Sequence, residues 1–132
     1  MNDPSLEVAQ AVVAAAQRVA SAAGLHLTIA VCDRAGHLLV LARHQDALLA
    51  SLEVAQVKAR TAVFFGADTK HLPFDQPFVP ALLGGVSYPV AFVPGGVLLR
   101  RAGEIVGGIG VGGGTADQDQ ACADAGRDAL GT

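Results

Sequence analysis

The sequence has no tryptophan, and aromatic residues make up only 5% of its 132 residues. A core without large rings must be built mainly from alanine, valine and leucine, which let backbones approach closely. Hydrophobic residues still reach 52%, far above the composition of a disordered chain. The length suits one compact domain whose core needs no disulfide or metal. We therefore expect residues 1–132 to form a single domain.

Cysteine and basic residues are also scarce. Cys32 and Cys122 lie far apart and form no CxxC pair, zinc-binding spacing or CxxCH haem-attachment motif, so we expect buried, reduced thiols. A formal net charge of -3 argues against a nucleic-acid partner. The first residues lack the basic and apolar segments of a secretory signal. A cytoplasmic protein is the default expectation.

Motifs for membrane insertion and for common enzyme classes are missing as well. The uncharged stretch 76–99 is long enough to cross a bilayer, but its four prolines and two Gly-Gly pairs are typical of loops and strands. We therefore expect no membrane partner. No Ser-His-Asp order, P-loop or HExxH motif occurs, so no motif assigns an enzyme class or a metal site.

Helical periodicity is present in three segments. They span residues 4–23, 49–65 and 115–129. Asp3 and Pro4 predict the start of the first helix, as N-cap and first helical residue. Thr115 and Gln118 have the spacing of a capping box at the start of the last helix.

Five short segments have strand character. They span residues 26–33, 37–43, 90–93, 97–101 and 104–111. A long Pro- and Phe-rich connection, residues 67–89, separates the second from the third, with a helical turn expected near Lys70; loops of this length are often functional lids. No helix separates the last three strands, which predicts an antiparallel meander. The expected fold is α+β, with one five-stranded antiparallel sheet and flanking helices.

Seven of the sixteen glycines lie in residues 103–120, including a literal GxGxxG at Gly108, Gly110 and Gly113. A dinucleotide-binding fold would need a further strand after the last helix, and none follows. Gly108, Gly110 and Gly112 instead alternate along one face of a strand. Two interpretations remain open: an alanine-rich helix packs on this face, or a flat ligand or a partner chain lies against it.

Several segments together resemble the GlcG/HbpS-like family, the haem-degrading-domain family that also includes the C-terminal domain of PduO-type proteins. They are VCDRAGHLLVLAR at 31–43, KARTA at 58–62, PGG at 94–96 and GEIVGGIGVGGGTADQDQACADAG at 103–126. The resemblance extends from about residue 6 to 127. It implies a profilin- or PAS-like fold with a five-stranded antiparallel sheet, and homo-oligomers from dimers to octamers. Some members bind haem or a corrinoid, so haem is a possible cofactor here.

Candidate ligand-binding residues come from the motifs of this resemblance and from the long loop. Lys58 and Arg60 lie in KARTA, and the planar fork of arginine suits a carboxylate, although both side chains could simply face solvent and Glu53 could pair with Arg60. The candidate backbone contacts are Gly95, Gly96, Gly110 and Gly113. Phe74 and Phe78, with Tyr88, could form an apolar pocket wall or a contact between subunits.

The candidate catalytic residues are His37, Asp33 and Asp119. His37 could be a general acid or base because its pKa is ordinarily near neutrality, or it could simply lie exposed at a turn that Asp33 stabilises. His44 and His71 are candidate haem ligands or exposed loop residues, and His26 is expected to be structural.

Three functional interpretations remain open. The first is a small-ligand-binding protein that holds haem or another tetrapyrrole, with the last strand, the second helix and the Pro/Phe-rich loop as pocket walls. The second is a cofactor-free isomerase, tautomerase or lyase acting on a small organic acid. The absence of histidine from residues 4–23, where the family resemblance suggests a haem ligand, and the unusual Pro- and Phe-rich region 67–90 favour this enzyme. The habit of the resembled family favours haem. The third is a purely structural oligomer.

Overall fold

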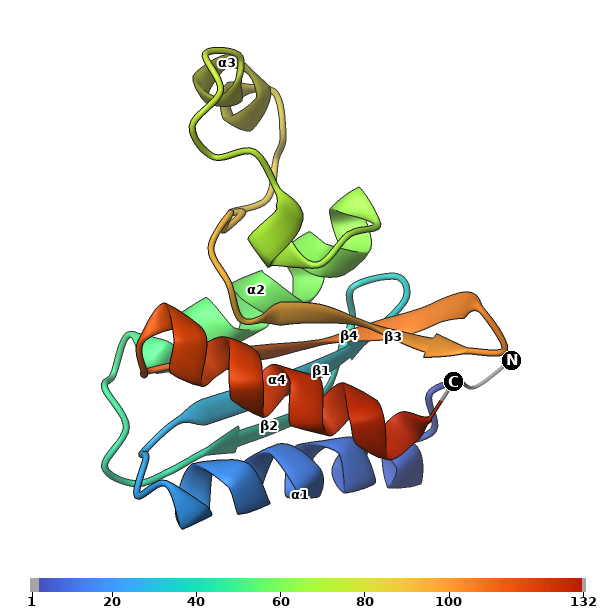
Figure 1. Ribbon diagram of the computed structural model, residues 1–132. Coiled ribbons are helices and arrows are strands. Elements are labelled where there is room, and N and C mark those ends of the chain that lie inside the picture. Colours follow the sequence, from blue (N-terminus) through green and yellow to red (C-terminus); the bar gives the residue numbers. More distant parts are fainter. Residues whose placement is uncertain (1–2, 132) are drawn as a thin grey trace.

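A computed structural model describes residues 3–131 and arranges them in layers about one antiparallel sheet (Figure 1). The strands are β1 (Thr28–Asp33), β2 (Leu38–Arg43), β3 (Gly96–Arg101) and β4 (Glu104–Gly112). The helices are α1 (Leu6–Ala22), α2 (Ser51–Phe65), α3 (Val79–Gly84) and α4 (Ala116–Leu130), with a short 3₁₀ helix, η1 (Thr69–His71). The α+β class and the flanking helices are as expected from the sequence.

Within residues 3–131 the sheet has four strands, in the order β2-β1-β4-β3, so the prediction of five was wrong. Residues 90–93 are strand-like in composition but form a loop. Their backbone groups bond to side chains instead of a neighbouring strand: Ala91 N donates to Thr61 Oγ1 over 3.1 Å, and Val93 O accepts from Thr69 Oγ1 over 2.5 Å. The predicted meander is therefore reduced to its last two strands: β3 and β4 pair antiparallel as expected, and β4 pairs on its other edge with β1.

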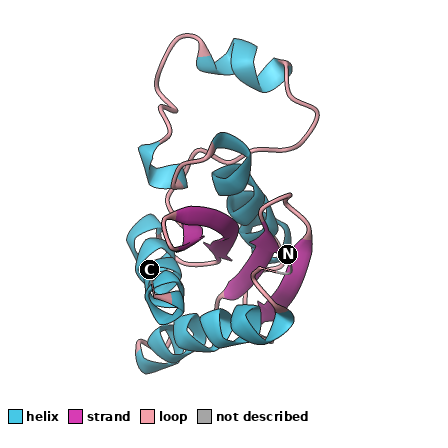
Figure 2. Cartoon of the chain, turned by 90° about the vertical axis from the view of Figure 1, so that its right-hand side faces the viewer, coloured by secondary structure: helices cyan, strands magenta, loops and turns pink. Residues whose placement is uncertain are grey.

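The two faces of β4 are covered by different helices. Ile109 and Val111 point into the main core, which also takes in buried residues of α1, α4, β1 and β3. Gly108, Gly110 and Gly112 face the opposite way, toward α2. Figure 2 shows α1 and α4 against one side of the sheet and α2 on the other. Because branched side chains alternate with glycines along β4, the strand can pack against helices on both faces, and α2 can approach the glycine face more closely.

The helix starts differ in how well the sequence predicted them. The capping box of α4 is present, with Thr115 Oγ1 accepting from Gln118 N and Gln118 Oε1 accepting from Thr115 N. Helix α1 begins at Leu6, later than expected, because the hydroxyl of Ser5 caps it by accepting from Val8 N over 3.2 Å. Pro4 therefore precedes the helix and is not part of it.

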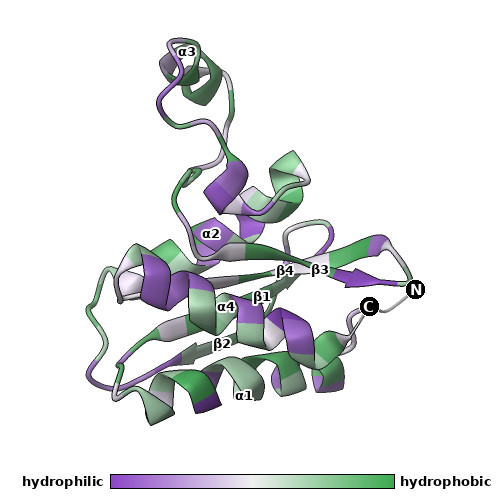
Figure 3. Cartoon of the chain, in the orientation of Figure 1, coloured by the Kyte–Doolittle hydropathy of each residue, from purple (hydrophilic) through white to green (hydrophobic). Residues whose placement is uncertain are grey.

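Residues 72–94, called the lobe below, project away from the sheet with α3 at the tip (Figure 1). The predicted helical turn near Lys70 is η1, whereas α3 was not predicted from the sequence. Buried Thr69 fixes the base of the lobe, since its hydroxyl also accepts from Gly96 N over 2.9 Å. Apolar residues gather on α3 (Figure 3). Within residues 3–131, every helix is too short or too polar to cross a membrane.

Candidate functional site

Helix α2 rests directly on the glycine face of β4. A β-carbon on Gly110 would collide with Ala55 O and lie 2.5 Å from Ala59 N. One on Gly108 would lie 2.6 Å from Ala59 O. Of the two interpretations drawn from the sequence, the packed alanine-rich helix is therefore the one that the structure contains. The backbone of Gly110 is buried under α2, which leaves no room for a ligand on that face.

Lys58 and Asp119 form a buried ion pair. Each side chain is only 4% exposed, and Lys58 Nζ lies 2.9 Å from Asp119 Oδ2. The ammonium group also donates to Val111 O over 2.9 Å, and Asp119 Oδ1 accepts from Gly114 N over 2.9 Å. These bonds join α2, the end of β4 and the start of α4. Both residues were functional candidates, but here each satisfies the other, away from solvent.

The remaining glycine candidates also serve backbone geometry. Gly95 has φ 119°, and a β-carbon there would lie 2.9 Å from Lys58 Nζ. Gly96 is buried, and a β-carbon there would lie 2.6 Å from the methyl group of Thr69. Gly113 has φ 110° in the turn between β4 and α4. Each position thus requires glycine for reasons of space or dihedral angle.

Arg60, by contrast, lies at an open cleft of about 410 Å³ between the β1–β2 turn, α2 and the base of the lobe. This Arg60 cleft is lined by Arg34, Ala35, Gly36, His37, Arg60, Val63, Phe64 and Tyr88. A second hollow of about 250 Å³ shares Arg60 and is lined by Glu53, Gln56, Val57 and Pro89. The volume of the Arg60 cleft is within the range of small-molecule pockets.

The Arg60 guanidinium contacts an aromatic ring but has no ion-pair partner among the described residues. Its carbon Cζ lies 5.4 Å from the centre of the Tyr88 ring, a cation–π contact. Its Nε is buried and has no hydrogen-bond partner among the residues that the structure describes. No carboxylate of residues 3–131, Glu53 included, is within ion-pair distance of it. A buried donor without an acceptor costs about 1–3 kcal/mol, so this group is suited to receive an acceptor from a ligand.

The β1–β2 turn forms the opposite rim of the Arg60 cleft. Asp33 Oδ1 accepts from Ala35 N over 2.9 Å and from His37 N over 3.0 Å, as the turn interpretation predicted. Partial burial would raise the pKa of Asp33, but these N–H groups and the nearby His37 outweigh it and lower that pKa. The His37 side chain is 79% exposed, with Nδ1 3.4 Å from Asp33 Oδ2. His37 can therefore reach a ligand in the cleft.

The aromatic candidates divide between the Arg60 cleft and the lobe. Tyr88 lines the cleft and packs edge-to-face against Phe64, with ring centres 6.1 Å apart. Phe74 and Phe78 are 71% and 54% exposed on the lobe and do not line this cleft, so they do not form the expected wall. Sequence reasoning missed Val63 and Phe64, although they follow Arg60 at the helical spacings of three and four residues that share a face.

His44 and His71 lie away from Arg60. His44 stacks on His26 beside a different cavity, and His71 lines a third one near Arg100 and Arg127. Of the four histidines in the chain, all of them within the described residues, His37 alone lines the Arg60 cleft.

Comparisons with known proteins identify the family to which this chain belongs. Residues 5–128 match the family described as "Haem degrading protein HbpS-like". The chain belongs to the HbpS-like family. Protein GlcG of Escherichia coli strain K12 is 34% identical over 108 residues, covering 81% of this chain and 79% of GlcG. The family resemblance inferred from the sequence is thus confirmed.

Two solved structures superpose over almost the whole chain. The crystal structure of a PduOC–haem complex has a TM-score of 0.88 at 30% identity, covering 95% of this chain and 93% of that one. A double mutant of Streptomyces reticuli HbpS has a TM-score of 0.87 at 36% identity, covering 97% of this chain and 87% of that one.

Proposed function

We propose that this HbpS-like protein binds haem, or a similar flat tetrapyrrole with carboxylate groups, in the Arg60 cleft. The observation that carries the proposal is the buried, unpartnered Nε of Arg60 beside an open cavity. A carboxylate on the ligand would supply the missing acceptor and a counter-charge in one contact. The PduOC relative crystallised with haem supports this class of ligand.

The other groups in the Arg60 cleft suit the same class of ligand. Haem supplies a flat apolar ring, carboxylates and an iron with axial coordination positions. Val63, Phe64 and Tyr88 offer apolar and aromatic surface for the ring. Arg34 is a second cation on the rim without an ion pair among the described residues, and the exposed His37 imidazole is the available axial ligand.

The alternative of an enzyme acting on a small organic acid gains no support from the comparisons. Its three acid–base candidates also do not all come together in one site. Asp119 is buried in its pair with Lys58, whereas Asp33 and His37 lie on the β1–β2 turn at the Arg60 cleft.

Titrating the protein with hemin and following the Soret band tests the proposal. Arg60→Ala removes a charge-assisted contact worth about 1.5–3 kcal/mol, so we expect hemin affinity to fall roughly ten- to a hundredfold. Arg18→Ala is the matched control, because Arg18 is an exposed arginine on another helix. If Arg60→Ala, folded by circular dichroism, binds hemin as tightly as the wild type, the proposal is wrong.

Iron-free and esterified porphyrins separate the roles of the two side chains. Protoporphyrin IX keeps the carboxylates but lacks iron, so its affinity should fall in Arg60→Ala and stay unchanged in His37→Ala. The dimethyl ester lacks the negative charges, so Arg60→Ala should bind it as the wild type does. Hemin binding that is lost in His71→Ala or His44→Ala and retained in His37→Ala would move the iron to another cavity.

We also propose that the protein is a homo-oligomer and that it works in the cytoplasm. Phe74, Phe78 and Tyr88 on the projecting lobe are each more than half exposed, and exposed apolar surface of this kind marks protein–protein contacts. The free, buried Cys32 and Cys122 suit a reducing compartment. Light scattering should give a dimer or larger at micromolar concentration, and Phe78→Asp should shift it toward monomer. A mass of 13.3 kDa across a dilution series would exclude the oligomer.

A further inference from the structure

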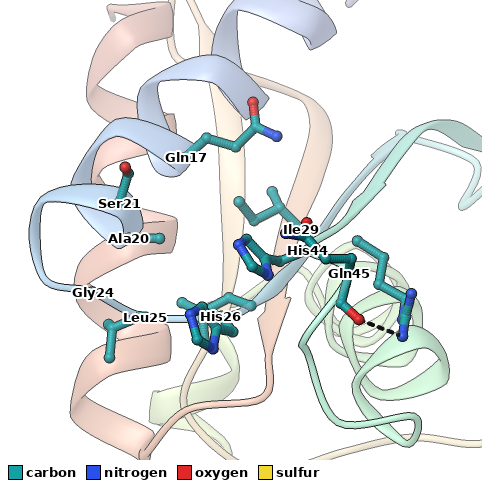
Figure 4. A pocket seen from close by; sticks show the side chains of 11 residues that line it. Gln17, Ala20, Ser21, Gly24, Leu25, His26, Ile29, His44 and Gln45 are labelled. Atoms are coloured by element: carbon teal, nitrogen blue, oxygen red, sulfur yellow. Dashed lines mark hydrogen bonds between the residues drawn. The ribbon is translucent and has the colours of Figure 1, made fainter.

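A second cluster of polar side chains lies at the far end of the β1–β2 pair, away from the Arg60 cleft. His26 precedes β1 and His44 follows β2. The two strands pair as far as Thr28 opposite Arg43, and His44 N then donates to Leu27 O over 3.1 Å. The sheet register thus brings both histidines to one place, and their rings stack with centres 4.4 Å apart (Figure 4).

Asp46 completes a three-residue set with these histidines. One nitrogen of each imidazole and one carboxylate oxygen of Asp46 all lie within 4.8 Å of one another. Two imidazoles and one carboxylate suit divalent first-row transition metals, and three protein ligands leave coordination positions open. A cavity of about 430 Å³ adjoins the set, with the polar side chains of Gln17 and Ser21 in its lining.

We propose that His26, His44 and Asp46 bind a divalent transition-metal ion such as Zn²⁺, with the open coordination positions facing this cavity. This site is independent of the Arg60 cleft and of any haem. The cysteines cannot compete for the ion, since Cys32 and Cys122 are both buried.

Binding requires a small local rearrangement that can itself be observed. Bonds of about 2.0–2.1 Å place tetrahedral ligand atoms roughly 3.3 Å apart, so the set must close from its present spacing. His26 and Asp46 are exposed, which leaves their side chains room to move. At present Asp46 N donates to His44 Nδ1 over 3.0 Å. That bond is lost whichever ring nitrogen takes the metal, because Nδ1 must then hold either the ion or a proton.

Isothermal titration of the haem-free protein with Zn²⁺ tests the site. We expect one ion per chain, and affinity about tenfold weaker or worse in each of His26→Ala, His44→Ala and Asp46→Asn. His71→Ala is the control, an exposed histidine outside the cluster, and should bind as the wild type does. Arg60→Ala should also bind Zn²⁺ normally, so failure of the haem proposal and failure of this one remain distinguishable.

Two spectroscopic measurements complete the test. Co²⁺ should give the ligand-field absorption of a protein-bound ion, lost in Asp46→Asn. In a ¹⁵N–¹H correlation spectrum, Zn²⁺ should shift the Asp46 amide signal as its hydrogen bond to His44 is lost. If the wild type fails to bind Zn²⁺, or if Asp46→Asn and His44→Ala bind it as tightly as the wild type, the site does not exist.

Discussion

Replacing Gly110 by alanine tests whether α2 lies directly on the backbone of β4. The new methyl carbon would lie 2.5 Å from Ala59 N and closer still to Ala55 O, whereas ordinary contacts begin near 3.4 Å. The obstructing atoms belong to helix backbone and cannot rotate aside, so α2 has to move outward by roughly 1 Å. Overpacking costs about 1–3 kcal/mol, and we expect the upper half of that range. For a chain of this length, Tm should fall by roughly 8–12 °C.

Calorimetry of Gly110→Ala should be run beside Gly84→Ala. Gly84 ends α3, has an ordinary φ, and has nothing within 4 Å of where its β-carbon would lie. The same chemical change there should leave Tm unchanged or slightly raised. Because Arg60 follows Ala59 on α2, the displaced helix should also weaken hemin binding in Gly110→Ala. A Gly110→Ala protein that melts within about 1 °C of the wild type would refute the close-packing argument.

Two further predictions concern buried polar groups. Lys58→Met leaves the Asp119 carboxylate buried without its counter-charge, so the free energy of unfolding measured in urea should fall by about 3–5 kcal/mol. The double variant Lys58→Met with Asp119→Leu removes both charges and should recover part of this loss. An equal loss in the double variant would contradict the reasoning. Burial raises the pKa of the Cys32 thiol to about 11, above its unfolded value of about 8.5. Between these two pKa values the folded state keeps a proton that the unfolded state releases. The free energy of unfolding should therefore fall by about 1.4 kcal/mol for each unit by which the pH rises from about 8.5 to about 11. Cys32→Ala should fall less steeply, and identical pH profiles would exclude the effect.

The sequence predicted well those features that depend on local pattern. The capping box at Thr115, the helical periods and the glycine alternation in β4 each act within a few residues, so their physics is visible in the chain itself. The strand predicted at residues 90–93 does not form, because strand-like composition does not determine which groups the backbone will bond to. The partners there are the hydroxyls of Thr61 and Thr69, which only the tertiary fold brings near.

The site was harder to predict because neighbours in sequence diverge in space. Lys58 and Arg60 are equally plausible ligand groups by residue type, yet two residues along a helix turn a side chain by about 200°. Lys58 consequently reaches Asp119 in the interior while Arg60 reaches the cleft. His26 and His44 are eighteen positions apart in the chain, and only the β1–β2 register brings them together.

The glycine face of β4 also restricts how this protein can vary over generations. Glycine is the smallest residue, so every replacement at Gly108 or Gly110 adds volume where the backbone of α2 already fills the space. Ile109 and Val111 on the other face can exchange with residues of similar volume at modest cost. Inserting or deleting one residue in the strand would exchange the two faces and turn the branched side chains toward α2. Substitutions can therefore accumulate on the face of β4 that carries Ile109 and Val111, whereas substitutions on the glycine face require a compensating change in α2.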